Sequence, residues 1–187
     1  MIYQRRLIRS TIVFCDKLKH YGIRGIALDW FKSYLTNLLQ YVEYNGVISS
    51  KLKLKCGIPQ GSILGPILFL IYINDITNAS NLLHLILFAD DTNIFLHNTN
   101  IENLIHIANT ELMKLSDWFI ANRLLLNIVK THFHLFCNSH KYYDSNLVKI
   151  ILCRHVIEQI QHVQFLGVYI DERLNFYENI NQVSSKI

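Results

Sequence analysis

The sequence predicts an α+β fold in one domain spanning residues 1–187, and three observations support this prediction. Apolar residues recur near a 3.6-residue period in segments 13–38 and 101–122, which is typical of amphipathic helices. β-prone runs occur at 84–96, 131–137 and 163–170. The chain has 187 residues, 51% of them hydrophobic, which is enough for one packed core and little more.

The N-terminal half is predicted to hold two helices, a hairpin and a buried helix. Gly22 and Gly25 interrupt the helical spacing of 13–38, which indicates two helices joined by a short turn. Strand-like runs at 40–44 and 51–55 flank Asn45-Gly46, a dipeptide that tolerates the positive φ of a tight hairpin turn. Segment 61–79 is apolar almost all round and carries Pro66 in its early turns, so we expect a buried helix there.

The second half is predicted to begin with a hairpin over residues 84–96, whose two β-prone halves meet at Ala89-Asp90-Asp91. A long amphipathic helix is expected over 101–122, with apolar residues at helical spacing. Further strands are expected at 131–137 and 163–170, and no internal repeat or long linker separates these pieces.

Several protein classes are excluded by composition. The longest apolar stretch, 63–73, has 11 residues, fewer than the ~20 that a membrane-spanning helix needs. The N-terminus shows no secretory signal, and the four cysteines form neither a CxxC pair nor a Cys/His cluster. We therefore expect an intracellular protein of the nucleus or cytoplasm, with reduced structural thiols and no membrane partner.

The charge distribution is uneven along the chain. Residues 1–60 hold ten Lys or Arg and three Asp or Glu, whereas residues 61–187 hold eight and eleven. A basic part beside an acidic one suits a protein that holds a polyanion and cations in different places. Charge alone favours the simpler interpretation of ordinary surface scatter.

Asp90 and Asp91 are the sharpest chemical feature of the sequence. Two adjacent carboxylates repel each other unless solvent, a turn or a cation relieves the repulsion. Mg²⁺ binds one or two carboxylates together with substrate phosphate oxygens, so an acidic hairpin tip is a candidate metal platform. For the isolated dipeptide, a solvated Asp-Asp turn is the favoured alternative.

The loop from Gly57 to Pro66 concentrates three glycines and two prolines in ten residues. Gly57 and Gly61 allow a ligand to approach the backbone closely, and Pro59 stiffens the loop. Ser62 is a candidate cap for the following helix, whose N-terminal amides would face an anion. A structural turn and a binding loop explain this pattern equally well.

The ordered motifs GIPQGSILGPILFLIYINDI, FADD, NRLLLNIVKT and FLGVYID resemble the reverse transcriptases of non-LTR retrotransposons of the LINE or jockey type. The preceding HYGIRGIALDWFKSYLTN and QYVEYNGV resemble the family's segment before the PQG loop, so the resemblance covers about residues 16–180. It implies a polymerase palm subdomain, an antiparallel sheet with helices on one face, together with part of the connection between fingers and palm. The fingers and the thumb would be incomplete.

The resemblance also implies a reaction, partners and site residues. The reaction is RNA-directed DNA synthesis with an RNA template, a DNA primer and deoxynucleoside triphosphates, assisted by Mg²⁺ or by Mn²⁺ in its place. Asp90 and Asp91 would hold the metal, and Lys130 would give a proton to the departing pyrophosphate. The nucleotide and template would contact Pro59, Gln60, Gly61 and Phe88, and the primer strand would be supported by Leu166 and Gly167. A surface lysine and a simple β-turn are the simpler interpretations of Lys130 and of Gly167.

The family's first catalytic motif, which supplies the third carboxylate, is absent upstream of HYGIRG. Asp16 falls in a helix of the family; a rival register, in which a deletion brings Asp16 to that place, is the weaker alternative. We therefore expect a fragment that is inactive alone. The second hypothesis is a non-catalytic remnant that binds nucleic acid through its basic residues, and a Mg²⁺-dependent nuclease is a distant third. The basic residues concerned are Arg5, Arg6, Arg9, Lys51, Lys53 and Lys55.

Overall fold

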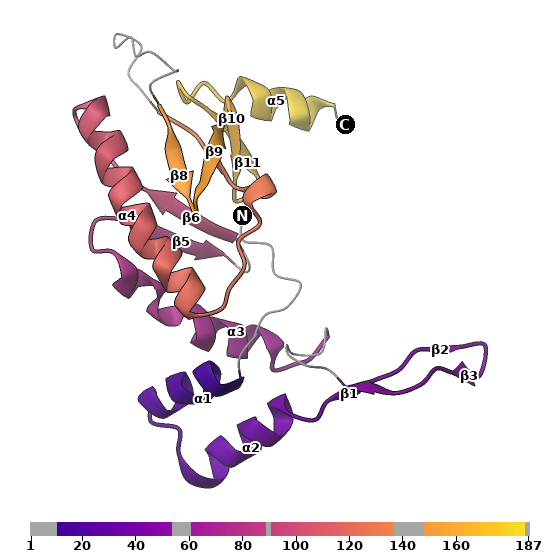
Figure 1. Cartoon of the computed structure of the whole chain (residues 1–187). Helices are drawn as coiled ribbons and strands as arrows, with labels where there is room; N and C mark the ends of the chain where they lie inside the picture. The colour runs from indigo at the N-terminus through magenta and orange to yellow at the C-terminus, as the bar shows by residue number, and fades with distance from the viewer. Residues whose placement is uncertain (1–10, 54–60, 89–90, 137–147, 186–187) are drawn as a thin grey trace. The chain divides into compact units, whose positions relative to one another are not determined.

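The computed structural model describes residues 11–53, 61–88, 91–136 and 148–185 (Figure 1). These residues form two compact units. The N-terminal unit comprises the described residues of 11–79 together with 118–125, and the sheet unit comprises those of 80–117 and 126–185. The predictions that lie outside the described residues concern Pro59, Gln60, Asp90, Lys55 and the N-terminal arginines. The single-domain organisation stays a prediction.

The N-terminal unit begins with two helices and a long hairpin, which confirms the predictions for these segments. The turn between β2 and β3 places Asn45 at φ 50° and Gly46 at φ 78°, the left-handed pair that a two-residue hairpin turn needs. The second strand begins directly after this turn, earlier than the predicted run at 51–55. The elements in order are α1 (Thr11–His20), α2 (Gly25–Leu35), β1 (Leu39–Gln40), β2 (Glu43–Tyr44), β3 (Val47–Ile48) and β4 (Leu52–Lys53).

The helix predicted over 61–79 is shorter than expected. It comprises α3 (Gly65–Ile73), with Pro66 in its first turn, followed by a 3₁₀ segment, η1 (Asn74–Ala79). Ile67 and Leu70 are more than half exposed, so the expectation that this helix is buried all round is wrong on one face. The Ser62 side chain does not cap α3: its hydroxyl is hydrogen-bonded to that of Tyr34.

The core of the N-terminal unit lies between α1, α3 and the 118–125 segment. Phe14 and Tyr72 are fully buried with ring centroids 5.9 Å apart, and the Tyr72 hydroxyl donates to the Asn122 carbonyl at 2.5 Å. The Lys17 side chain is 12% exposed; its Nζ donates to the Tyr72 carbonyl at 2.6 Å and to Asp75 Oδ1 at 2.5 Å. Burial lowers the pKa of the Lys17 ammonium, and Asp75 opposes this shift.

The sheet unit contains the predicted hairpin, the predicted long helix and a set of short strands. The last turn of α4, residues 118–121, belongs to the N-terminal unit. The strand predicted at 131–137 is shorter in the structure, where it comprises only His132–Phe133. The segment predicted as one strand at 163–170 forms the two strands of a hairpin. The elements in order are β5 (His84–Phe88), β6 (Asp91–Phe95), α4 (Ile101–Ala121), η2 (Ile128–Lys130), β7 (His132–Phe133), β8 (Ile150–Leu152), β9 (His155–Gln159), β10 (His162–Phe165), β11 (Val168–Asp171) and α5 (Tyr177–Ser184).

The described strands form five small sheets. Four are antiparallel pairs, and the fifth has the order β7-β9-β8 with β7 parallel to β9. A continuous antiparallel palm sheet therefore stays a prediction. No helix within the described ranges has the length and apolar character to cross a membrane.

Polar side chains of α4 attach the helix to the β8–β9 hairpin. The Asn109 side chain donates to the Lys149 carbonyl at 2.9 Å and accepts from the Ile151 amide at 2.8 Å. Its amide group therefore satisfies the hydrogen-bonding capacity of two backbone groups at the edge of β8. A second contact comes from the same face of α4, where Ser116 Oγ accepts from the Cys153 amide at 3.0 Å. This side-chain coverage protects an otherwise open sheet edge.

The start of the β5–β6 hairpin is held by a buried polar group. Ser80 donates to Glu111 Oε2 at 2.6 Å, and its Oγ accepts from the backbone amides of Leu82 and Leu83. Lys114 donates to the other Glu111 oxygen at 2.7 Å. The hydrogen bonds from Lys114 and Ser80 lower the pKa of the Glu111 carboxyl. The chain is thus fixed to α4 immediately before β5 begins.

Candidate functional site

The β5–β6 hairpin presents Asp91 at the first position of β6. The antiparallel register pairs Phe88 with Asp91 and Leu87 with Thr92, so Phe88 and Asp91 face each other across the end of the ladder. Phe88 is 61% exposed and Asp91 is half-buried. The hairpin therefore places a half-buried aspartate opposite an exposed phenylalanine. The Thr92 hydroxyl is buried, with no hydrogen-bond partner among the described residues.

A metal ion at this hairpin would have to use Asp91 together with groups outside the described residues. Within the described ranges there is no cluster of three or more His, Cys, Asp or Glu side chains that could hold a metal. A carboxylate oxygen is nevertheless the donor type that Mg²⁺ takes, in combination with phosphate oxygens and water. The neighbouring Asp90 adds a second donor of the same type in the sequence. The residue types therefore fit a two-carboxylate Mg²⁺ site.

The predicted primer-supporting residues form the turn between β10 and β11. Leu166 has φ 48° and Gly167 has φ 89°, and the strands pair from Phe165↔Val168 to His162↔Asp171. The left-handed conformation at both turn positions is the geometry that closes a two-residue hairpin. Leu166 is 55% exposed, so the turn presents an apolar side chain to solvent.

Two residues that the sequence analysis did not single out stabilise β11 and the segment that follows it. Asp171 Oδ1 accepts from the amides of Arg173 at 3.0 Å and Asn175 at 2.9 Å, and the Asn175 amide is the main cause that lowers the pKa of the Asp171 carboxyl. Asn179 of α5 accepts from the Tyr169 amide at 3.2 Å. An Asp at the end of a β-prone run, followed by polar residues, is a turn signal that could have identified Asp171.

An aromatic contact joins the two hairpins of the site. Phe95 of β6 and Phe165 of β10 meet edge to face, with ring centroids 5.7 Å apart. Phe95 lies four residues after Asp91, a distance of about 13 Å along a strand. Because Phe165 adjoins the Leu166-Gly167 turn, that turn is connected to the base of the β5–β6 hairpin, away from Asp91.

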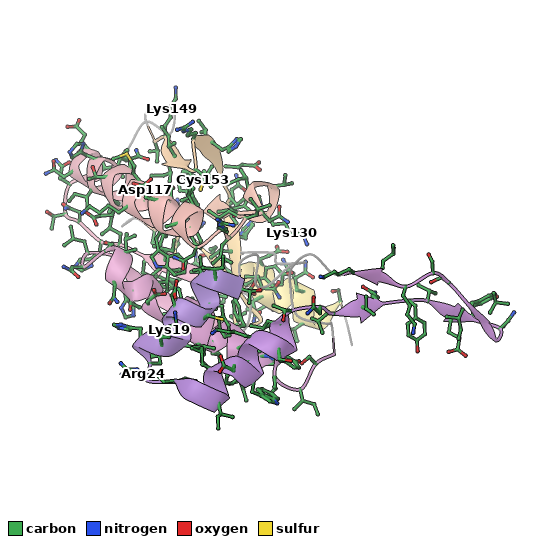
Figure 2. All side chains as sticks on the ribbon, turned by 60° about the horizontal axis from the view of Figure 1, so that its bottom comes forward. Lys19, Arg24, Asp117, Lys130, Lys149 and Cys153 are labelled. Atoms are coloured by element: carbon green, nitrogen blue, oxygen red, sulfur yellow. The ribbon has the colours of Figure 1, made fainter. Side chains whose placement is uncertain are left out.

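The remaining predicted site residues are more dispersed. Lys130 is exposed at the end of η2, where its amide donates to the Asn127 carbonyl at 3.1 Å (Figure 2). Gly61 has φ 83° and belongs to the N-terminal unit, in the turn before α3. The structure therefore brings Phe88 and Asp91 together and Leu166 and Gly167 together.

Substitutions at the β10–β11 turn test its backbone requirement. We expect Gly167→Ala to lower the free energy of unfolding by about 1 kcal/mol, because a Cβ is strained at this φ. Leu166→Asn should raise it by up to about 1 kcal/mol, since Asn tolerates the left-handed region better. Urea unfolding of both variants measures the two changes. Equal effects of the same sign would contradict a turn governed by backbone conformation.

Comparison with known proteins places these features in a family. A family model described as "Reverse transcriptase (RNA-dependent DNA polymerase)" matches residues 13–170. The chain is also 24% identical over 160 residues to the Drosophila melanogaster protein named "Probable RNA-directed DNA polymerase from transposon X-element". That alignment covers 83% of this chain and 17% of the relative, so the chain spans about a sixth of the relative's length. Since the family model covers most of the chain, including both hairpins of the site, this protein belongs to the reverse transcriptase (RNA-dependent DNA polymerase) family.

Proposed function

We propose that this chain is the palm part of an RNA-directed DNA polymerase encoded by a non-LTR retrotransposon, with Asp90 and Asp91 as metal ligands. The observation that carries the proposal is the β5–β6 hairpin, which sets Asp91 opposite the exposed Phe88 within the region matched by the family model. The transposon assignment is supported by the printed name of the Drosophila relative and by the motif order in the sequence.

In the proposed reaction, a primer 3′ hydroxyl attacks the α-phosphate of a deoxynucleotide and pyrophosphate departs. Mg²⁺ at the Asp90-Asp91 pair would supply positive charge that stabilises the attacking and leaving oxygens. Lys130 would give a proton to the departing pyrophosphate. The incoming nucleotide and the RNA template would contact Phe88 and the loop that contains Pro59, Gln60 and Gly61.

The spacing of the two hairpins supports a primer path along the sheet unit. About 13 Å of β6 separates Asp91 from Phe95, which contacts the residue before the Leu166-Gly167 turn. At 3.4 Å for each nucleotide of one strand, this corresponds to about four nucleotides. A primer strand supported at the turn could therefore place its 3′ end near Asp91.

Primer extension on an RNA template, with deoxynucleotides and Mg²⁺, tests the chemistry. Only two of the family's three metal-binding carboxylates, Asp90 and Asp91, are proposed for this chain. We therefore expect the wild-type chain to extend the primer no more than the Asp90→Asn variant does. Even ~1 Å of misplacement of the reacting atoms costs about 100-fold in rate. Extension that Asp90→Asn abolishes would support the polymerase function and show instead that a further carboxylate completes the site.

Thermal unfolding in Mg²⁺ tests the metal site independently of catalysis. At ten times the Kd, a bound ion stabilises the folded chain by about 1.4 kcal/mol, which corresponds to roughly 3–6 °C in Tm. We expect this shift in the wild type and its loss in Asp90→Asn, measured at constant ionic strength. Asp117→Asn, at an exposed carboxylate of α4, is the matched control and should keep the shift. Loss of the shift in both variants would count against a site at the hairpin.

The second candidate function is nucleic-acid binding without catalysis. It is favoured by the exposed ammonium groups of Lys51 and Lys53. This candidate predicts RNA binding that weakens steeply with salt and is indifferent to Mg²⁺. The polymerase proposal instead predicts the Mg²⁺-dependent shift in Tm.

A further inference from the structure

The hairpin ribbon formed by residues 39–53 is exposed along its whole length. Every residue in this range is exposed, and no described segment covers the ribbon, whose turn between β2 and β3 is visible in Figure 1. Contiguous exposed apolar surface of this kind marks interaction sites. The large apolar side chains concerned are Leu39, Tyr41, Val42, Tyr44, Val47, Ile48 and Leu52.

The strand register divides these side chains between two faces. Residues directly opposite each other share a face, and successive residues alternate between faces. The pairs Gln40↔Leu52 and Tyr44↔Val47 belong to a face without charge, which also carries Val42.

The opposite face holds the pairs Leu39↔Lys53 and Glu43↔Ile48, with Tyr41 between them. The registers of the two ladders differ by one residue, so the second strand contains one extra residue between Ser49 and Leu52, as in a β-bulge.

An aromatic ring and two ammonium groups combine on the charged face. Lys51 Nζ lies 5.9 Å from the centroid of the Tyr41 ring, which brings Lys51 onto this face despite the bulge. Tyr41 remains 48% exposed, so part of its ring is open to a planar ligand. Lys53 adds a second cation on the same face, and Glu43 lies farther along the ribbon toward the turn.

We propose that the face formed by Tyr41, Lys51 and Lys53 binds single-stranded nucleic acid. One base stacks on the Tyr41 ring, and the two lysines contact the phosphates on either side. Charge complementarity favours a polyanion on this face, while the uncharged face offers no cation to hold one. A single strand is the ligand because stacking on a side chain requires an unpaired base. The inference deepens the proposed function, on which it rests for the identity of the strand as RNA template.

Fluorescence anisotropy with a labelled single-stranded RNA of about 20 nucleotides, longer than the ~4–16 nucleotides of a typical single-strand site, measures this binding. We expect Tyr41→Leu to weaken the affinity about 5- to 100-fold through the lost stacking. Tyr44→Leu makes the same change on the uncharged face and should change the affinity by less than about twofold. Both side chains are exposed, so neither change should lower Tm, and melting curves check this. Equal losses in the two variants, or no binding by the wild type, would overturn the proposal.

The lysines are tested through the salt dependence of the same binding. Removing two phosphate contacts with Lys51→Gln and Lys53→Gln should reduce the slope of log affinity against log salt by about 1.4, since each contact to a single strand contributes ~0.7. Lys32→Gln with Lys149→Gln removes the same charge from exposed positions elsewhere and should leave the slope unchanged (Figure 2 labels Lys149). A slope that falls equally in both double variants would show a non-specific charge effect and overturn the assignment. The Mg²⁺ shift in Tm does not depend on these residues, so failure of the ribbon and failure of the metal site are distinguishable.

Discussion

Raising the pH through the range 10 to 12 should remove about 2–3 kcal/mol from the free energy of unfolding of the wild type relative to Tyr72→Phe. Tyr72 is fully buried and donates to the Asn122 carbonyl. Burial raises the pKa of its phenol from 10.0 to about 12. Between these two values the folded chain retains a proton that the unfolded chain loses. The stability from the neutral phenol is therefore complete below pH 10 and disappears as the pH rises through 12.

The Tyr72→Phe variant isolates this contribution because it keeps the ring and removes the titrating group. Below pH 10 we expect the variant to be less stable than the wild type by about 1–3 kcal/mol, since the buried Asn122 carbonyl loses its donor. Above pH 10 the stability of the wild type relative to the variant should fall by about 2–3 kcal/mol as the pH rises through 12. Urea unfolding of both proteins at a series of pH values measures it, and the other nine tyrosines cancel in the comparison. A difference that stays constant through pH 11 would contradict the assignment of the shift to burial of Tyr72.

Elements with a strong local signal were predictable from the sequence. Asn45-Gly46 formed the expected hairpin turn, since both residues adopt positive φ at low cost. The helical periodicity of 101–122 predicted α4 to within a residue at its C-terminal end. The β5–β6 hairpin followed from two β-prone halves around an acidic turn.

Elements imposed by tertiary contacts were missed. The β8–β9 hairpin turns at Cys153 and Arg154, which have φ 50° and 67° although neither residue is a turn former. Contacts from α4, including the bond from the Cys153 amide to Ser116, stabilise this turn, and they are invisible in the local sequence. Helix α5 likewise begins after Phe176 at φ 58°, without a side-chain cap to announce it.

The candidate site shows the same division. Motif order predicted the candidate residues of the reaction, but the contacts around two of the predicted positions came from the structure. Asp171 accepts from backbone amides that follow β11, and Asn179 accepts from an amide within β11. The Phe95 ring reaches Phe165 from a different hairpin. Such contacts join segments up to 70 residues apart, so no local pattern encodes them.

Lys17→Met should lower the free energy of unfolding by about 2–4 kcal/mol. This loss is smaller than the full cost of breaking a buried ion pair, because the Asp75 side chain is 35% exposed. The ammonium binds the Tyr72 carbonyl and Asp75, and it lies 4.9 Å from the ring centroids of both Tyr72 and Trp118. Met keeps the apolar stem but leaves that carbonyl and carboxylate without their donor.

Lys19→Met is the matched control, because Lys19 lies on the same helix and pairs with Asp16 at an exposed position. Urea unfolding at pH 7 should show a large loss for Lys17→Met and none outside error for Lys19→Met. Equal losses would mean that helix α1 depends on its overall positive charge. A loss confined to Lys17 would show that one buried cation joins α1 to α3, to η1 and to the last turn of α4.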